Sequence, residues 1–263
     1  MNKWVREINA IITIAIRDIL ILFKTPSYFI FSLIMPLIFM GILGGSLSQN
    51  MAGDLGYDYG QFLLVGMIIN QLLMGTTGGI TSLVEDRTED FTQELMVSPI
   101  SRYSIIVGKI VGSSFSAILQ LLGTLLTAFI MGIHYSIWQL LAVLAISPII
   151  CLTAGSLGMI IVAFVKDNRT AGMVQMLVTM PQMFLTGVFI PINHSKGILL
   201  ILSRLMPMTY CLDLARAVFF YGTAGYKNIV LFNPVFDLLI IAALTVLFLF
   251  IGTFFFARSE TNR

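Results

Sequence analysis

Charged residues are scarce in this sequence. Asp, Glu, Lys and Arg make up 11% of its 263 residues, against roughly 25% in an ordinary soluble domain. Hydrophobic residues make up 57%, and the mean hydropathy is +0.94. With so few polar groups available to cover a core, the apolar excess must face lipid. The scarcity excludes a water-soluble globule and indicates an integral membrane protein.

Cysteine and histidine are also rare, with two of each. Cys151 and Cys211 lie inside apolar runs, and two cysteines at this distance match neither a disulfide framework nor a spaced metal site. His134 and His194 are remote from any nucleophile signature. The net charge of +2 gives no reason to expect nucleic acid as a partner. We therefore expect no metal site and no catalytic residue.

The sequence lacks an energy source of its own. Gly108 and Lys109 are adjacent, but the upstream glycine of a phosphate-binding loop is missing, so no ATP site of that type is present and no cofactor is expected in this chain. Asn70, Gln71 and Gln120 fall in apolar runs, but they are too few and uncharged for a proton relay. These absences argue against a stand-alone ion-coupled carrier.

What the sequence does contain is a series of long apolar runs. A bilayer core needs about 20 mainly apolar residues per helix, and six segments qualify. They are residues 28–47, 62–84, 110–133, 138–165, 171–190 and 238–257. Hydrocarbon offers no partner for exposed backbone groups, so each span must be helical. The predicted class is all-α, with six transmembrane helices.

Lys and Arg are distributed unevenly among the predicted loops. Only four of the fifteen fall on one side, and they all lie in one long segment: Lys196, Arg204, Arg216 and Lys227. The other eleven fall on the side of both termini. Cytoplasmic loops carry the excess of Lys and Arg, so we expect both termini in the cytoplasm.

Residues 1–26 precede the first span. A polar stripe recurs there at spacings of three and four on an Ile-rich helix, formed by Arg6, Asn9, Thr13 and Arg17. Such a helix should lie along the cytoplasmic interface. A seventh span is the alternative, but Arg17 and Asp18 would then sit in mid-membrane at a high energetic cost.

The cytoplasmic loop 85–102 combines a charged run with apolar residues. A solvated face explains the acids, but not Phe91, Leu95 and Met96. Their spacing predicts a short amphipathic helix that Pro99 ends. An apolar edge on a cytoplasmic helix suits insertion into a groove of a soluble partner.

The outer segment 191–233 contains two apolar stretches too short to span, 197–206 and 211–220, separated near Pro207. They predict a re-entrant helical hairpin. Asp213 and Arg216 share a face of its second helix, where a mutual ion pair is plausible. We expect either an exposed pair of little energetic value or charges that hold an outer gate closed.

Two motifs stand out in the chain. The first consists of Asp86-Arg87, Phe91, Glu94 to Arg102 and Gly108-Lys109, and the second of Gly187 to Phe189, Pro191, Pro207 to Tyr210, Asp213 and Arg216. Together with the features above, these motifs resemble the type-2 ABC exporter permeases, most closely their daunorubicin-exporter-like branch. The chain departs from the family pattern at Asp90, where glycine is common, and in lacking a proline between Pro191 and Pro207.

The resemblance implies a bacterial inner-membrane permease that pairs with a second permease subunit, identical or homologous, and with two cytoplasmic ATP-binding cassette subunits. ATP and magnesium would bind to those ATPase subunits. The residues implied in ATPase coupling are Asp86, Arg87, Phe91, Glu94, Leu95, Met96 and Pro99. The residues expected at the outer hairpin gate are Pro191, Pro207, Tyr210, Asp213 and Arg216.

The expected organisation is an interfacial helix (1–26), a membrane domain (27–258) and a cytoplasmic tail (259–263). The expected function is the transport path of an ATP-driven exporter for a lipophilic or amphiphilic, drug-like or lipid-like substrate. A permease for a lipid-linked polysaccharide is the alternative within transport. An intramembrane enzyme is the alternative of another class, but it would need an activated nucleophile or a metal-holding acid cluster.

Overall fold

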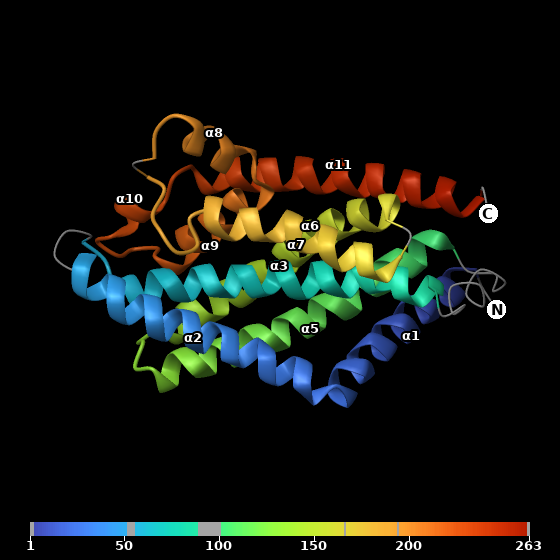
Figure 1. Cartoon of the computed structure of the whole chain (residues 1–263), viewed down its shortest axis with the longest axis horizontal. Helices are drawn as coiled ribbons and strands as arrows, with labels where there is room; N and C mark the ends of the chain where they lie inside the picture. Colours follow the sequence, from blue (N-terminus) through green and yellow to red (C-terminus); the bar gives the residue numbers. More distant parts are fainter. Residues whose placement is uncertain (1–2, 52–55, 89–100, 166, 194, 262–263) are drawn as a thin grey trace.

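The computed structural model (Figure 1) describes residues 3–51, 56–88, 101–165, 167–193 and 195–261. Over these residues the chain forms helices and no strand, which confirms the all-α class. The helices are α1 (Lys3–Lys24), α2 (Pro26–Met51), α3 (Tyr59–Thr88), α5 (Arg102–Ile130), α6 (Ile137–Phe164), α7 (Asn168–Leu185), α8 (Ile198–Leu205), α9 (Pro207–Phe219), α10 (Tyr226–Ile229) and α11 (Pro234–Thr261).

Four stretches among the described residues are long and apolar enough to cross a membrane: Tyr59–Asp86, Tyr103–Ile130, Ile137–Phe164 and Tyr226–Phe256. They coincide with four of the six predicted spans. Joining α8 and α9 across their 83° bend would give a fifth. The predicted span 28–47 corresponds to α2, whose described apolar part is Leu33–Gly44. The predicted span 171–190 corresponds to α7, which contains several polar residues. The count of six stays a prediction.

Local sequence fixes where several helices begin. Ser136 caps α6 in a reciprocal arrangement with Gln139, in which each side chain accepts a hydrogen bond from the other's backbone N–H. Ser101 caps α5, and Asp167 caps α7 by accepting from the Thr170 N–H. These caps satisfy orphan N–H groups of the first helical turn. The starts of α5, α6 and α7 are therefore set by the residues that cap them.

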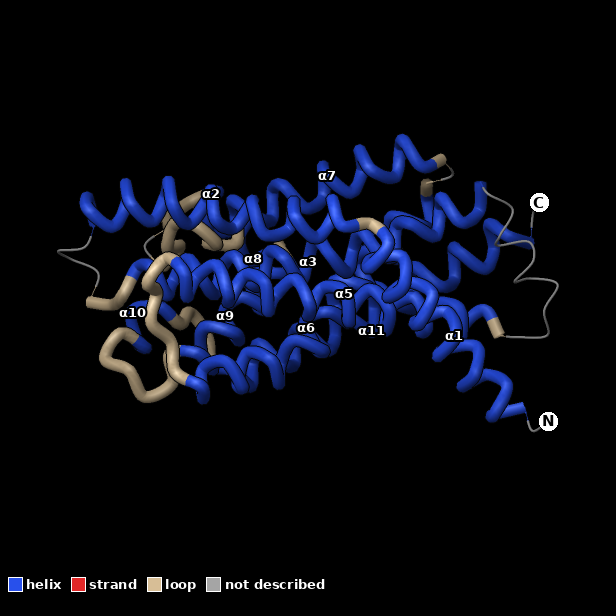
Figure 2. The backbone as a smooth tube through the Cα atoms, turned by 90° about the horizontal axis from the view of Figure 1, so that it is seen from below, coloured by secondary structure: helices blue, strands red, loops and turns tan. Residues whose placement is uncertain are grey.

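The bundle has two distinct ends. Both termini lie at one end, where α3 finishes, α5 begins and α6 passes into α7 (Figure 1). Most of the irregular connections lie with α10 at the opposite end (Figure 2). The end that holds the termini is the one predicted to face the cytoplasm from its Lys and Arg content, and the other is the predicted outer end.

Helix α3 forms the centre of the bundle, with 83% of its most apolar window buried, whereas the corresponding window of Tyr226–Phe256 is 17% buried. Small residues allow its neighbours to approach closely. A Cβ atom added to Gly158 of α6 would lie 3.0 Å from Cβ of Ile80, and Gly79 of α3 lies against Ser113 of α5. The Ala154–Gly158 run is a helix-packing surface.

Helix α1 runs obliquely to the bundle and packs against α5 (Figure 1). Gly108 and Gly112 make this contact possible, because Cβ atoms there would lie 3.0 Å from Cβ of Ile14 and 2.9 Å from Cβ of Asp18. Other apolar side chains of α1, including Ile8, Ile12 and Ile16, are exposed. Exposed isoleucines suit a lipid-facing surface, although the interfacial placement of α1 stays a prediction.

Candidate functional site

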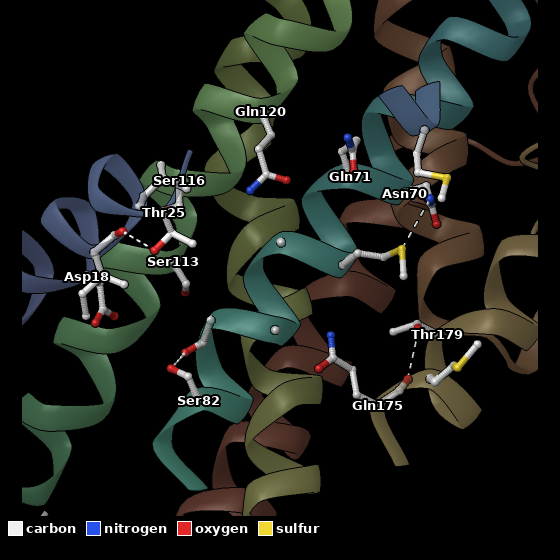
Figure 3. Close-up of a pocket in the computed structure, with 18 of the residues that line it drawn as sticks. Asp18, Thr25, Asn70, Gln71, Ser82, Ser113, Ser116, Gln120, Gln175 and Thr179 are labelled. Atoms are coloured by element: carbon white, nitrogen blue, oxygen red, sulfur yellow. Dashed lines mark hydrogen bonds between the residues drawn. The ribbon is translucent and has the colours of Figure 1, made fainter. Parts of the chain in front are cut away.

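A cavity of about 910 Å³ opens among α1, α2, α3, α5 and α7. Its wall combines two kinds of side chain. Amide groups come from α3, α5 and α7, and Figure 3 shows Asn70, Gln71, Gln120 and Gln175 around the space. The apolar part consists largely of thioethers, contributed by Met35, Met67, Met74, Met176, Met180 and Met183. Methionine is flexible and polarisable, so such a wall adapts to apolar groups of varied shape.

Small residues shape the part of this wall formed by α3. Gly75, Gly78 and Gly79 line the cavity. A Cβ atom at Gly75 would lie 3.2 Å from Cβ of Ala117 and 3.4 Å from Nε2 of Gln120. Gly75 and Gly79 are therefore close-packing positions, and the lack of a side chain at Gly75 also leaves room beside the Gln120 amide.

A cluster of four charges, of which the Arg17 side chain is 30% exposed and the other three are largely buried, lines the end of the cavity nearer the termini. Lys109 of α5 is 2% exposed, and its Nζ donates to Asp86 Oδ2 at 2.9 Å and to Asp18 Oδ1 at 3.0 Å. The Arg17 guanidinium donates to both Asp86 oxygens, at 2.6 and 3.2 Å. The cluster joins α1, α3 and α5, and its two cations neutralise its two carboxylates.

The Asp18 carboxyl shows the energetic strain of this arrangement. Burial raises its pKa above the usual value, although Lys109 opposes the shift. Its second oxygen, Oδ2, is buried and has no hydrogen-bond partner among the residues that the structure describes. Removing the Lys109 cation would therefore leave a buried carboxylate without its main compensation.

Asp86 does not lie on the solvated face that explains the acids of loop 85–102 in the sequence. Asp86 is 7% exposed, and its carboxylate lies between Arg17 and Lys109. A charge at the end of a membrane span is stabilised by pairing with an opposite charge. This geometry suits a positioning role better than direct contact with a soluble partner. Arg87 lies in the last turn of α3.

Helix α1 also forms hydrogen bonds with the start of α5, on the other side of segment 89–100. Oε2 of Glu7 accepts from the Ser101 N–H at 2.9 Å and from the Ser104 hydroxyl at 2.7 Å. The two ends of the segment 89–100 thus adjoin residues bonded to α1, with Asp86 before it and Ser101 after it. Phe91, Glu94, Leu95, Met96 and Pro99 lie outside the described residues.

At the opposite end, the predicted hairpin is a pair of helices. Pro207 begins α9, where its missing N–H breaks no helical hydrogen bond, and α8 and α9 meet at 83°. The hydroxyl of Tyr210 donates to the Arg204 carbonyl at 2.8 Å, and its ring stacks on Phe232. Pro191, which is half-buried, lies between α7 and α8. The break predicted near Pro207 is confirmed.

Asp213 and Arg216 are buried anchors on α9. They are 1% and 2% exposed. The Asp213 carboxylate accepts from the Leu231 and Phe232 N–H groups, both at 2.8 Å. Arg216 Nη2 donates to the Gly187 carbonyl at 2.6 Å, and its guanidinium lies 3.7 Å from the Phe62 ring centroid. One charge therefore holds the chain before α11, and the other holds the turn after α7.

That geometry contradicts the expected exposed ion pair, whereas the role of these charges at an outer gate stays a prediction. The two side chains form no ion pair within 4.0 Å, although both are described, and neither is exposed. Both side chains instead bond to free backbone groups in the loops that flank the α8–α9 hairpin. A hydrogen bond between a charged side chain and a backbone group is strong. Gly187 has a φ of +87°, which presents its carbonyl to Arg216.

Sequence reasoning missed Asp237 in the first turn of α11. It is fully buried, and neither carboxylate oxygen has a hydrogen-bond partner in the described structure. It also missed the pairing of Arg17 and Asp18 with Asp86 and Lys109. The available signal was the presence of both signs of charge in or beside apolar segments, where each charge requires a partner.

Comparison with known proteins gives one family. Residues 9–220 match the family described as ABC-2 type transporter. Nodulation protein J of Rhizobium meliloti (strain 1021) is 25% identical over 188 residues, which cover 70% of each chain. Nodulation protein J of Rhizobium leguminosarum bv. trifolii is 28% identical over the same length and coverage. The inner membrane transport permease YadH of Escherichia coli (strain K12) is 24% identical over 192 residues, or 72% of each chain.

Proposed function

Because this chain belongs to the ABC-2 type transporter family, in which it is a membrane transport subunit, we propose that it forms the translocation path of an ATP-driven exporter. The observation that carries the proposal is the cavity of about 910 Å³ with amides on one part of its wall and methionines on another. A site of this size and mixed character accommodates a small amphiphile. The proposed cargo is accordingly lipophilic or amphiphilic.

The proposed assembly contains two such permease subunits and two cytoplasmic ATP-binding cassette subunits, which bind ATP and magnesium. The open side of the cavity would face the second permease. Segment 89–100, with Phe91, Leu95 and Met96 on its apolar edge, would dock into the ATPase. The α1 contacts on either side of it would then pass its displacement to the cavity wall, since Asp18 and Asp86 line that wall.

At the other end, the hairpin of α8 and α9 would close the outer mouth of the path. Arg216 and Asp213 support this role because they attach α9 to the backbone on both sides of the hairpin. The proposed location is the bacterial inner membrane with both termini in the cytoplasm, which the relative YadH and the excess of basic residues at that end support.

The test is co-purification with the ATPase encoded nearest to this chain, followed by ATP hydrolysis in nanodiscs. We expect a complex that hydrolyses ATP. Leu95→Asp should weaken it by about tenfold or more, as removal of an interface anchor does. Leu95→Met, which keeps the apolar contact, should bind as the unmodified chain does. Equal binding by all three proteins would contradict the docking assignment.

A further inference from the structure

Two amide groups of the cavity have no oxygen acceptor for their N–H groups among the described residues. Gln120 is 2% exposed, and its Nε2 has no hydrogen-bond partner in the described part of the chain. Asn70 Nδ2 contacts the Met74 sulfur at 3.7 Å, and a thioether is a weak acceptor. Both residues line the cavity, from α5 and α3 (Figure 3). A buried donor without an oxygen acceptor is unfavourable, so an oxygen from a ligand would satisfy it.

The charged residues that line the cavity offer no unpaired cation to an anionic ligand. Arg17 and Lys109 lie against Asp18 and Asp86, so the four formal charges cancel. A phosphate or sulfate headgroup would have to displace an existing carboxylate from its cation. An uncharged oxygen acceptor needs no such exchange.

The rest of the wall suits an alkyl chain. Met176 and Met180 of α7 line the cavity and are 53% and 45% exposed. They recur at i and i+4 on one face of α7. Exposed thioethers beside amide donors provide a surface for a flexible apolar tail next to a site for a polar head.

Resting on the proposed function, we propose that the cavity selects amphiphiles whose headgroup is uncharged and rich in oxygen acceptors, such as an amide carbonyl or sugar hydroxyls. The headgroup accepts hydrogen bonds from Gln120 and Asn70, and the tail lies along Met176 and Met180. Amphiphiles with the same tail and an anionic headgroup bind less well.

The test uses probes that share a dodecyl chain with a terminal photoreactive diazirine and differ in headgroup: N-methylglucamide, phosphate and trimethylammonium. Binding to the full chain in nanodiscs is measured below the critical micelle concentration, and labelled peptides are identified by mass spectrometry. We expect the glucamide to bind at least about fivefold more tightly than the phosphate and to label α7. Equal or tighter phosphate binding, or labelling confined to α11, would overturn the inference.

Variants test the two donors directly. Gln120→Met keeps the side-chain length but removes the donor, and should weaken glucamide binding about three- to tenfold, the range for one hydrogen bond. Asn70→Leu should act in the same direction. Gln61→Met is the matched control, because Gln61 Nε2 donates to the His134 carbonyl near the other end of the bundle; it should change binding less than about twofold.

A variant that gains affinity for one probe distinguishes the loss of a specific hydrogen bond from misfolding. Gln120→Glu replaces the donor with a carboxyl group, and should weaken glucamide binding while strengthening binding of the trimethylammonium probe. Unchanged glucamide binding by both Gln120 variants would overturn the headgroup assignment. ATPase co-purification on the same samples tests the proposed function separately: a chain that selects the glucamide but captures no ATPase contradicts only the proposed function.

Discussion

The two ends of the bundle use buried charge in different ways. At the end that holds the termini, Arg17, Asp18, Asp86 and Lys109 bind one another across three helices. At the other end, Asp213 and Arg216 bind backbone groups of the chain segments on either side of α9. Side-chain pairs can exchange partners when helices move, whereas charges bound to backbone groups hold a turn in place. The first arrangement suits transmission of movement, and the second suits a fixed outer cap.

The largest effect is expected from Lys109→Met. It leaves Asp18 and Asp86 buried with only part of their compensation, which costs about 3 to 5 kcal/mol when a buried pair loses one partner. We expect a large fall in the thermal unfolding midpoint in nanodiscs. Lys227→Met, at an exposed position at the other end, is the control and should have little effect. A Lys109 variant as stable as this control would refute the buried cluster.

Arg216→Met is expected to cause the second-largest loss of stability. It leaves the Gly187 carbonyl without its donor and removes the contact with the Phe62 ring. A hydrogen bond to a charged group contributes about 1.5 to 3 kcal/mol. Arg204→Met, on the exposed part of α8, should be milder. Thermal unfolding followed by size-exclusion chromatography compares the two, and equal losses would contradict the anchoring role of Arg216.

Coupling energies distinguish the two ends more sharply. In a double-mutant cycle, Lys109→Met with Asp18→Asn should show coupling of at least about 1 kcal/mol, because Lys109 Nζ and Asp18 Oδ1 are 3.0 Å apart. Arg216→Met with Asp213→Asn should couple more weakly than that, since the two side chains lie on one helix face but hydrogen-bond to different backbone segments. Stronger coupling at the hairpin than at the cluster would reverse the comparison.

The smallest effect is expected at Glu7. Glu7→Ala removes the acceptor for the Ser101 N–H and the Ser104 hydroxyl, and should destabilise by about 1 kcal/mol. Glu7→Gln keeps an acceptor oxygen and should lose less. Chemical denaturation in nanodiscs measures both. If Gln were as damaging as Ala, the negative charge rather than the acceptor would hold the start of α5.

The predictable part of the structure depends on chain-local signals. Hydropathy located four spans now seen in α3, α5, α6 and α11, and Pro207 marked the break between α8 and α9. Hydropathy is a property of each segment, and a proline restricts its own backbone.

Partner choice could not be predicted in the same way. Asp213 and Arg216 are neighbours on one helix face, so sequence spacing favoured a mutual pair. Their actual partners, Leu231, Phe232 and Gly187, are 18 to 29 residues away and are brought near by packing. The cavity amides Asn70 and Gln120 were visible as polar residues in apolar runs, but their convergence depends on how α3 packs against α5.

The central claim is that this chain provides a path for an amphiphile powered by a separate ATPase. Its most direct test is uptake of a fluorescent dodecanoyl glucamide into inside-out membrane vesicles that contain the chain and its co-purifying ATPase. We predict accumulation that requires ATP and is lost when the chain carries Leu95→Asp. Uptake that is independent of ATP, or equal in vesicles lacking the chain, would contradict the account.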